Sequence, residues 1–137
     1  MADYSAESER FARGQAVLRR LTGDDRTLSS AMAEVNEVTP DLVRLVIEFV
    51  FGEVYSRPGL DPQRRHLVTL SCLISLGAEE ELRVHVGLAL NTGLTSDEIV
   101  EAILHSAVYA GFPRAVTAMR VAREVFIDRG IIQPGQR

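Results

Sequence analysis

Proline and glycine constrain the fold of this chain most, because they divide it into segments of ordinary helical length. Within these segments apolar residues recur at helical spacing, as Leu42, Leu45, Val46 and Phe49 do after Pro40. No segment alternates apolar and polar residues in the manner of a half-buried strand. The sequence therefore predicts an all-α fold, a single-domain helical bundle.

The ends of the predicted helices follow from residues that cap or interrupt a helix. Ser5 is a candidate N-cap for a first helix, and Thr39 before Pro40 is typical of another helix start. Thr95 and Glu98 have the spacing of a capping box. The predicted helices run over residues 5–20, 41–55, 61–76, 79–92 and 95–110 and, after Gly111 and Pro113, through Ile127, while residues 25–38 leave room for one short helix.

Composition limits the classes of partner. Of the 137 residues 46% are hydrophobic but only 6% are aromatic, so the core must be built mainly from Leu, Val, Ile and Ala. A formal net charge of −4 argues against nucleic acid, which requires a clustered basic surface. No apolar run approaches the length that spans a bilayer, and the N-terminal residues lack a signal core. We therefore expect a soluble, cytoplasmic protein with no membrane partner.

Cysteine and histidine spacing argues against a redox or metal centre. Cys72 is the single cysteine, so the chain has no CxxC pair and no internal disulfide. A di-iron helical bundle needs a carboxylate three residues from a histidine, and the residues three before each histidine are Gln63, Leu82 and Ala102. The HExxH motif is absent as well. We predict no metal and no cofactor.

His85 is the first candidate for chemistry. It shares one helical face with Leu82, Val86 and Ala89, so its ring should point into a core or an interface. A buried histidine needs a polar partner, and on an anonymous helix a structural role is the simpler interpretation. Proton transfer is the alternative, and Glu81, one helical turn earlier, can then tune the pKa of the imidazole.

The first turns of the helix over 61–76 and the loop before it carry further candidates. Arg65 can bind a carboxylate, or it can pair structurally with another helix. His66 follows it directly. Glu53 and Arg57 stand four residues apart, where they can bind a substrate or hold the loop together.

The predicted helix over 95–110 adds two candidates for substrate contact. Glu101 precedes His105 by one turn, and a surface ion pair is the preferred interpretation of that spacing. Tyr109 follows His105 by another turn and can offer its hydroxyl to a bound carbonyl. A tyrosine on an apolar helix is nevertheless more often packed, with its hydroxyl at the rim.

Four motifs together resemble the carboxymuconolactone decarboxylase family. They are Glu53-Val-Tyr-Ser-Arg-Pro-Gly-Leu-Asp61, Glu81-Leu-Arg-Val-His85, Asn91-Thr-Gly-Leu-Thr95 and Val108-Tyr-Ala-Gly-Phe-Pro113. The match runs over roughly residues 40–125 in the order and spacing of that family. The resemblance implies an alkylhydroperoxidase D-like fold with a central antiparallel helical hairpin. It also implies one domain over 1–137, with a helical arm at 1–39, a core at 40–128 and a flexible tail at 129–137.

The family resemblance implies cofactor-independent decarboxylation of γ-carboxymuconolactone to an enol-lactone, in the protocatechuate branch of aromatic catabolism. His85 matches the site histidine of the wider superfamily, so proton transfer becomes its expected role. Arg65 matches a common family arginine and, with Arg57, is expected to bind the anionic substrate. His66 departs from the family, which usually has serine or another small or polar residue there, and is assigned a supporting or substrate-specific role. Assembly into a homo-oligomer, a trimer or hexamer, is also implied.

Three other functions bear on this resemblance. The thiol peroxidases of the same superfamily have a CxxC four and seven residues before the site histidine, where this chain has Glu81 and Ala78, so that branch is excluded. A decarboxylase, isomerase or cyclase acting on an intermediate of specialised metabolism remains open, with His66 as its main support. A non-catalytic oligomer that binds a small acid is the third alternative.

Overall fold

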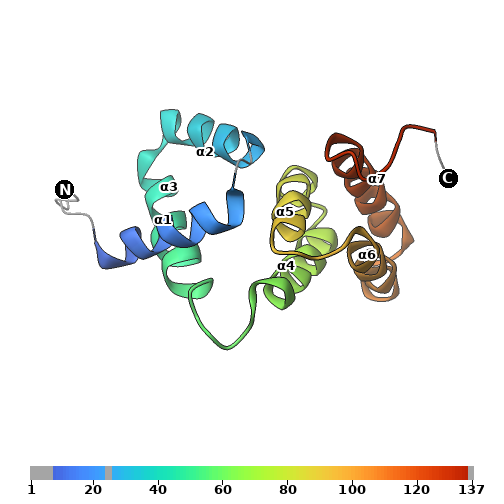
Figure 1. Cartoon of the computed structure of the whole chain (residues 1–137), viewed down its shortest axis with the longest axis horizontal. Helices are drawn as coiled ribbons and strands as arrows, with labels where there is room; N and C mark the ends of the chain where they lie inside the picture. Colours follow the sequence, from blue (N-terminus) through green and yellow to red (C-terminus); the bar gives the residue numbers. More distant parts are fainter. Residues whose placement is uncertain (1–7, 24–25, 136–137) are drawn as a thin grey trace. The chain divides into compact units, whose positions relative to one another are not determined.

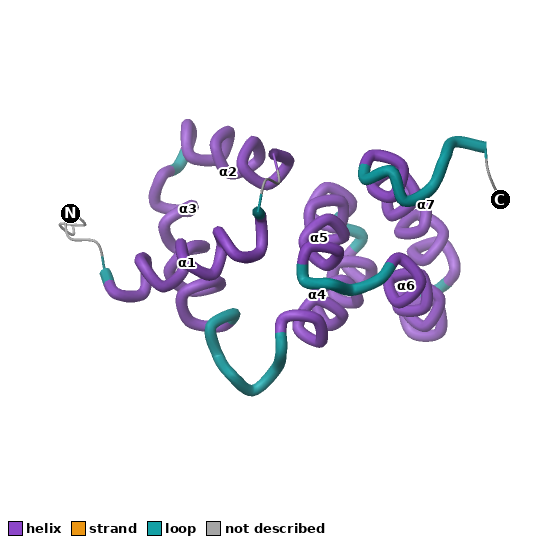
Figure 2. The backbone as a smooth tube through the Cα atoms, viewed as in Figure 1, coloured by secondary structure: helices purple, strands orange, loops and turns teal. Residues whose placement is uncertain are grey.

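The computed structural model describes residues 8–23 and 26–135, with only the backbone described at 26–29, and all the regular secondary structure in these ranges is helical (Figures 1 and 2). This confirms the all-α prediction. None of the described helices is both long and apolar enough to cross a bilayer. The elements in chain order are α1 (Glu9–Thr22), α2 (Arg26–Val38), α3 (Pro40–Leu45), η1 (Val46–Val54), α4 (Pro62–Leu76), α5 (Glu79–Asn91), α6 (Ser96–Ala110) and α7 (Phe112–Asp128).

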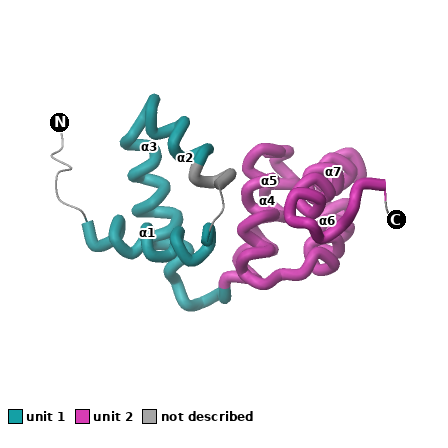
Figure 3. The backbone as a smooth tube through the Cα atoms, turned by 45° about the horizontal axis from the view of Figure 1, so that its top comes forward, with its two compact units in different colours: residues 1–61 teal, residues 62–137 magenta. Residues whose placement is uncertain are grey.

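Contacts between residues divide the chain into two compact units, residues 1–61 and 62–137 (Figure 3). The division falls at the end of the loop after η1, whereas the sequence analysis divided an arm from a core at residue 39. The predicted single domain stays a prediction. Within the segment expected to be a flexible tail, Ile131 N donates to Phe126 O at 2.8 Å and Ile132 packs against the core.

The first helix starts later than its expected cap. Ser5 lies outside the described residues, and Ser8 is the N-cap of α1, accepting a hydrogen bond from Phe11 N at 3.1 Å. The Ser8 hydroxyl also donates to Glu48 Oε1 at 2.7 Å, which joins the start of α1 to η1. The segment that left room for a short helix forms α2, over Arg26–Val38.

The predicted α-helix over 41–55 is only partly α-helical. From Val46 the backbone widens into a π-helix, and Tyr55 N donates to Val50 O, five residues back, at 2.8 Å. The wider turn leaves the Gly52 carbonyl to accept side-chain donors, namely Arg13 Nε at 2.6 Å and Ser56 Oγ at 2.9 Å. Apolar periodicity over so short a segment does not distinguish the two kinds of turn, so the sequence analysis missed the π-helix.

Two glycines let α1 and η1 cross with their backbones in contact. A Cβ added to Gly14 would collide with the Ile47 carbonyl, and one added to Gly52 would collide with the Arg10 carbonyl. Neither carbonyl can move aside cheaply, because each belongs to a helical backbone. The crossing therefore requires glycine at both positions.

Residues 62–137 form a bundle of four helices. α4 and α5 make the predicted hairpin, joined at Gly77, whose φ of +73° suits glycine. α4 packs against α5 and α6, and α7 packs against α5 and α6. Residues with 0% or 1% exposure fill the space between them: Leu70, Ile74, Val86, Ala89, Ile99, Ile103, Ala118 and Ala122.

The helix ends of this bundle agree with the expected caps. Thr95 Oγ1 accepts from Glu98 N at 3.1 Å and Glu98 Oε2 accepts from Thr95 N at 2.8 Å, which completes the capping box of α6. α4 begins at Pro62 and ends at Leu76, as the sequence indicates. α7 begins at Phe112, with Pro113 in its first turn rather than before it.

We predict that Gly14→Ala or Gly52→Ala lowers the free energy of unfolding by roughly 1–3 kcal/mol, the usual cost of overpacking. The sign is informative, because alanine is otherwise about 1 kcal/mol better than glycine in a helix. Urea denaturation followed by circular dichroism measures the change. Gly59→Ala is the matched control, since a Cβ there meets nothing within 4 Å. A Gly14 or Gly52 variant as stable as the parent would contradict the backbone contact.

Candidate functional site

The α4/α5 hairpin brings His66 and His85 together. His66 lies in the first turns of α4 and His85 in the middle of α5, and their ring centroids are 6.0 Å apart with planes inclined by 42°. His66 is 0% exposed and His85 is half-buried. Leu82, Val86 and Ala89 are buried on α5, in agreement with the expectation that His85 turns inward with them.

One contact determines the tautomer of the neutral His66 ring. Its Nδ1 lies 2.9 Å from the carbonyl oxygen of Pro62, one turn earlier on the same helix. A carbonyl oxygen can only accept, so Nδ1 carries the hydrogen and the neutral ring has its lone pair on Nε2. Burial lowers the pKa of His66, and the hydrogen bond to Pro62 acts in the opposite direction.

His85 is held neutral by its surroundings. Burial is the largest cause, the nearby His66 adds to it and Glu81 opposes it, and together they lower the pKa of His85 to about 4. Nδ1 of His85 is buried and has no hydrogen-bond partner among the described residues. A buried ring nitrogen of this kind calls for a ligand, a water molecule or a movement of its neighbours. The site thus contains a neutral imidazole that can take up a proton.

Arg65 and Glu81 are close in sequence to His66 and His85, respectively. Arg65 precedes His66 on α4 and is partly buried, whereas Glu81 is exposed, one turn before His85 on α5. Glu81 acts on His85 through its charge, as the spacing suggests. Among the described residues, no three His, Cys, Asp or Glu side chains are grouped so as to hold a metal ion.

Glu53 and Arg57 belong to the unit formed by residues 1–61. Glu53 Oε2 lies 3.7 Å from Arg10 Nε and 3.7 Å from an Nη atom of Arg13, so its carboxylate contacts α1. Arg57 is exposed in the loop after η1. A role for either residue in the same site as His85 stays a prediction.

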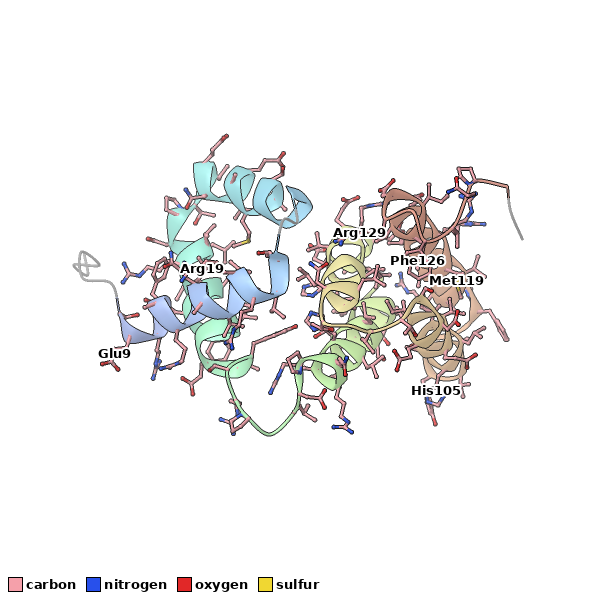
Figure 4. All side chains as sticks on the ribbon, in the orientation of Figure 1. Glu9, Arg19, His105, Met119, Phe126 and Arg129 are labelled. Carbon is pink, nitrogen blue, oxygen red and sulfur yellow. The ribbon has the colours of Figure 1, made fainter. Side chains whose placement is uncertain are left out.

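His105 and Tyr109 form a separate ring pair on α6. Their centroids are 5.6 Å apart and both side chains are exposed, Tyr109 by 83%, with His105 projecting outward from its helix (Figure 4). The expectation that Tyr109 packs with only its hydroxyl at the rim is therefore wrong for this chain. Its apolar neighbours on α6 are exposed too, as Val108 is by 72%. Substrate binding by His105 or Tyr109 stays a prediction.

Two hollows open on the surface of α6 and α7, and neither is lined by His66 or His85. One, of about 540 Å³, has polar residues such as Asp97, Arg120 and Arg123 in its lining. The other, of about 520 Å³, is almost wholly apolar. We place the chemistry at the histidine pair, because a buried group with a strongly shifted pKa is a better mark of a reactive site than a hollow alone.

The contact between the His66 ring and the Pro62 carbonyl was not predicted from the sequence. A signal was present, since a polar side chain four residues after a residue in the first turn of a helix can reach its carbonyl. Burial of the His66 ring is what turns this local contact into a fixed tautomer.

Comparison with known proteins follows the motifs found in the sequence. The model of the carboxymuconolactone decarboxylase family matches residues 40–124, more than half of the chain. A 4-carboxymuconolactone decarboxylase of Acinetobacter baylyi is 39% identical over 125 residues, which cover 91% of this chain and 92% of the relative. The nitrosuccinic acid decarboxylase npaB of Metarhizium robertsii is 36% identical over 118 residues, covering 86% and 82%.

A third relative is an uncharacterized 15.0 kDa protein of Paracoccus denitrificans, 31% identical over 99 residues that cover 71% of this chain and 74% of that protein. The two relatives named for an activity are both decarboxylases, which supports decarboxylation as the class of reaction. The resemblance inferred from the four motifs is confirmed, and the chain belongs to the carboxymuconolactone decarboxylase family.

Proposed function

We propose that this protein is a cofactor-independent decarboxylase that acts on 4-carboxymuconolactone or a closely related activated dicarboxylic acid. The observation that carries the proposal is the half-buried, neutral imidazole of His85, whose Nδ1 has no hydrogen-bond partner among the described residues. Decarboxylation of an activated acid needs little more from a protein than anion binding, charge stabilisation and one proton.

The substrates named for the two decarboxylase relatives share a chemical feature. In 4-carboxymuconolactone the carbon that bears the leaving carboxylate is next to an alkene conjugated with the lactone carbonyl, and in nitrosuccinic acid that carbon bears a nitro group. Each acid also has a second carboxylate on a one-carbon arm of the same carbon. We therefore propose a succinic acid skeleton with an electron-accepting group on the carbon that loses CO₂.

The proposed reaction balances without an external electron acceptor. The bond between carbon and the leaving carboxylate breaks, CO₂ departs, and the electron pair moves onto the oxygen of the lactone or nitro group. A proton then bonds to carbon, so each turnover consumes one proton. His85 is the proposed donor. It is neutral before substrate binds, and the charge of a bound dianion then raises its pKa so that it takes up a proton from solvent. The protonated ring gives this proton to carbon.

We assign binding of the retained carboxylate to Arg65, on the same helix as His66. A guanidinium presents a planar fork that matches a carboxylate. Arg57, Glu53, Tyr109 and His105 are kept as proposed substrate contacts. Because the nitrosuccinic acid decarboxylase is nearly as similar as the 4-carboxymuconolactone decarboxylase, an acid of specialised metabolism is the second candidate substrate. Aromatic catabolism and a cytoplasmic location are part of the first proposal.

We also propose that the protein forms a homo-oligomer, a trimer or hexamer. Support comes from large apolar side chains left open on a single chain, which in a soluble protein mark interaction surfaces. The most exposed of these are Val38 at 85%, Tyr109 at 83%, Phe112 at 77% and Leu76 and Val108 at 72%.

Substitution of His85 tests the catalytic assignment. We predict that His85→Gln lowers kcat by roughly 10²–10⁴-fold, the usual contribution of a positioned acid or base, while the dissociation constant for substrate changes little. Release of CO₂ and calorimetric titration measure the two quantities. Cys72→Ser, an exposed change on α4, is the control and should leave both unchanged. Equal kcat in His85→Gln and the parent would remove His85 from the mechanism.

A panel of acids tests the proposed substrate class. Purified protein should decarboxylate 4-carboxymuconolactone, nitrosuccinate or both, and should leave methylsuccinate intact, because methylsuccinate has two carboxylates but no electron-accepting group. Product mass and dissolved CO₂ are the measurements. Tight binding of these acids with no turnover of any would favour the non-catalytic binder.

The low pKa of His85 predicts the pH dependence. Protonation is needed for donation, and the free protein loses that proton as pH rises through about 4, so kcat/KM should fall about tenfold per pH unit between pH 5 and 8. The profile of kcat should bend at a higher pH, since it reports the complex with a bound anion. A kcat/KM that is constant or rises over this range would exclude His85 as the acid.

A further inference from the structure

A series of hydrogen-bonding groups starts at the first turn of α4. The Pro62 carbonyl oxygen accepts a hydrogen bond from Nδ1–H of His66, with 2.9 Å between nitrogen and oxygen. The His66 ring is 0% exposed, so water does not compete for this contact. The remaining nitrogen of the neutral ring, Nε2, is then an acceptor. His66 thus offers a lone pair inside the bundle, from a ring that its own helix holds in place.

His85 provides the matching donor. A neutral imidazole has its hydrogen either on Nδ1 or on Nε2. With the hydrogen on Nε2, Nδ1 of His85 has a lone pair and so has Nε2 of His66, so neither of these nitrogens can donate to the other. With the hydrogen on Nδ1, His85 has a donor for the acceptor on His66, and a hydrogen bond between them would satisfy the buried Nδ1.

The spacing of the rings fits a contact that closes when a ligand binds. The 6.0 Å between centroids is about 1 Å more than a direct N–H···N hydrogen bond between two imidazoles requires. Catalytic hydrogen bonds are often long before the substrate is bound and shorten in its complex. A bridging water serves the same purpose at the longer distance.

We infer that His66 is a positioning residue: its Nε2 accepts a hydrogen bond from the Nδ1–H of His85, which leaves Nε2 of His85 as the nitrogen that exchanges a proton with the substrate. The inference rests on the proposed function for its catalytic consequence, and it goes further by assigning the tautomer and the reacting nitrogen. It also gives a physical role to His66.

The charges around the pair agree with a single positive charge, carried by His85. His66 and Glu81 are the groups whose charge acts on His85, in opposite directions. Of the charged groups that α7 presents to α5, Glu124 pairs with Arg83 and Arg129 donates to Asn91 Oδ1 at 2.9 Å. When His85 takes up a proton, His66 remains neutral, because its Nδ1–H keeps donating to the Pro62 carbonyl and its Nε2 accepts a hydrogen bond from His85.

Nitrogen-15 NMR of the histidine rings tests the tautomer without any turnover. We expect His85 to have its hydrogen on Nδ1 at pH 7, in the unliganded protein and with succinate as a non-reacting probe. His66→Leu removes the acceptor at similar volume and should shift His85 toward the Nε2–H form that is common in water. His66→Gln, whose Oε1 can accept, should restore the Nδ1–H form. His105→Asn identifies the signals of the third and last histidine.

Kinetics supply the second measurement. His66→Leu should lower kcat by roughly 10–100-fold, the usual effect of losing a residue that orients a reactive group, with little change in KM. His66→Gln should recover most of that loss. A wild-type His85 with its hydrogen on Nε2 would overturn the inference, and this spectrum alone decides if His66→Leu fails to fold. An unchanged tautomer in a folded His66→Leu would overturn it equally.

The two proposals can fail separately. If the wild type decarboxylates the activated acids but His85 has its hydrogen on Nε2, the inference about His66 is wrong and the proposed function stands. If no acid is turned over and the Nδ1–H form is present and lost in His66→Leu, the tautomer assignment stands and the proposed function is wrong.

Discussion

Burial of two imidazoles against each other is the constraint on which the candidate site depends. The α4/α5 hairpin turns at Gly77 and packs its apolar face into the bundle, and this packing buries His66 completely and His85 in part. Two buried rings cannot both be charged at neutral pH, because each loses hydration and repels the other. The fold thereby sets the resting protonation of the site before any substrate arrives.

This resting state suits a reaction that consumes a proton. A histidine that was already protonated would attract anions of every kind, whereas under the proposed mechanism a neutral one gains its charge only when a bound dianion compensates it. The charge of a bound dianion would then account both for selectivity toward a doubly charged acid and for the ability of His85 to donate a proton. Arg65, which precedes His66 on α4, has a guanidinium that stays positively charged.

Helix positions and the inward turn of His85 could be predicted from sequence because they rest on local rules. The capping box at Thr95 and the helix starting at Pro62 involve residues within one turn of each other. The π-helix and the open position of Tyr109 could not, because they depend on what packs against the helix. The Pro62 contact lay between these cases, since its spacing is local but its importance comes from burial.

The crossing of α1 and η1 at Gly14 and Gly52 has a consequence for how this unit tolerates change. Most packed surfaces adapt to a substitution because side chains can find other rotamers. Here the backbone of α1 contacts the backbone of η1, so no flexible side chain lies between them that could move to make room for an added methyl group. The two glycines therefore restrict the register in which α1 can pack on η1.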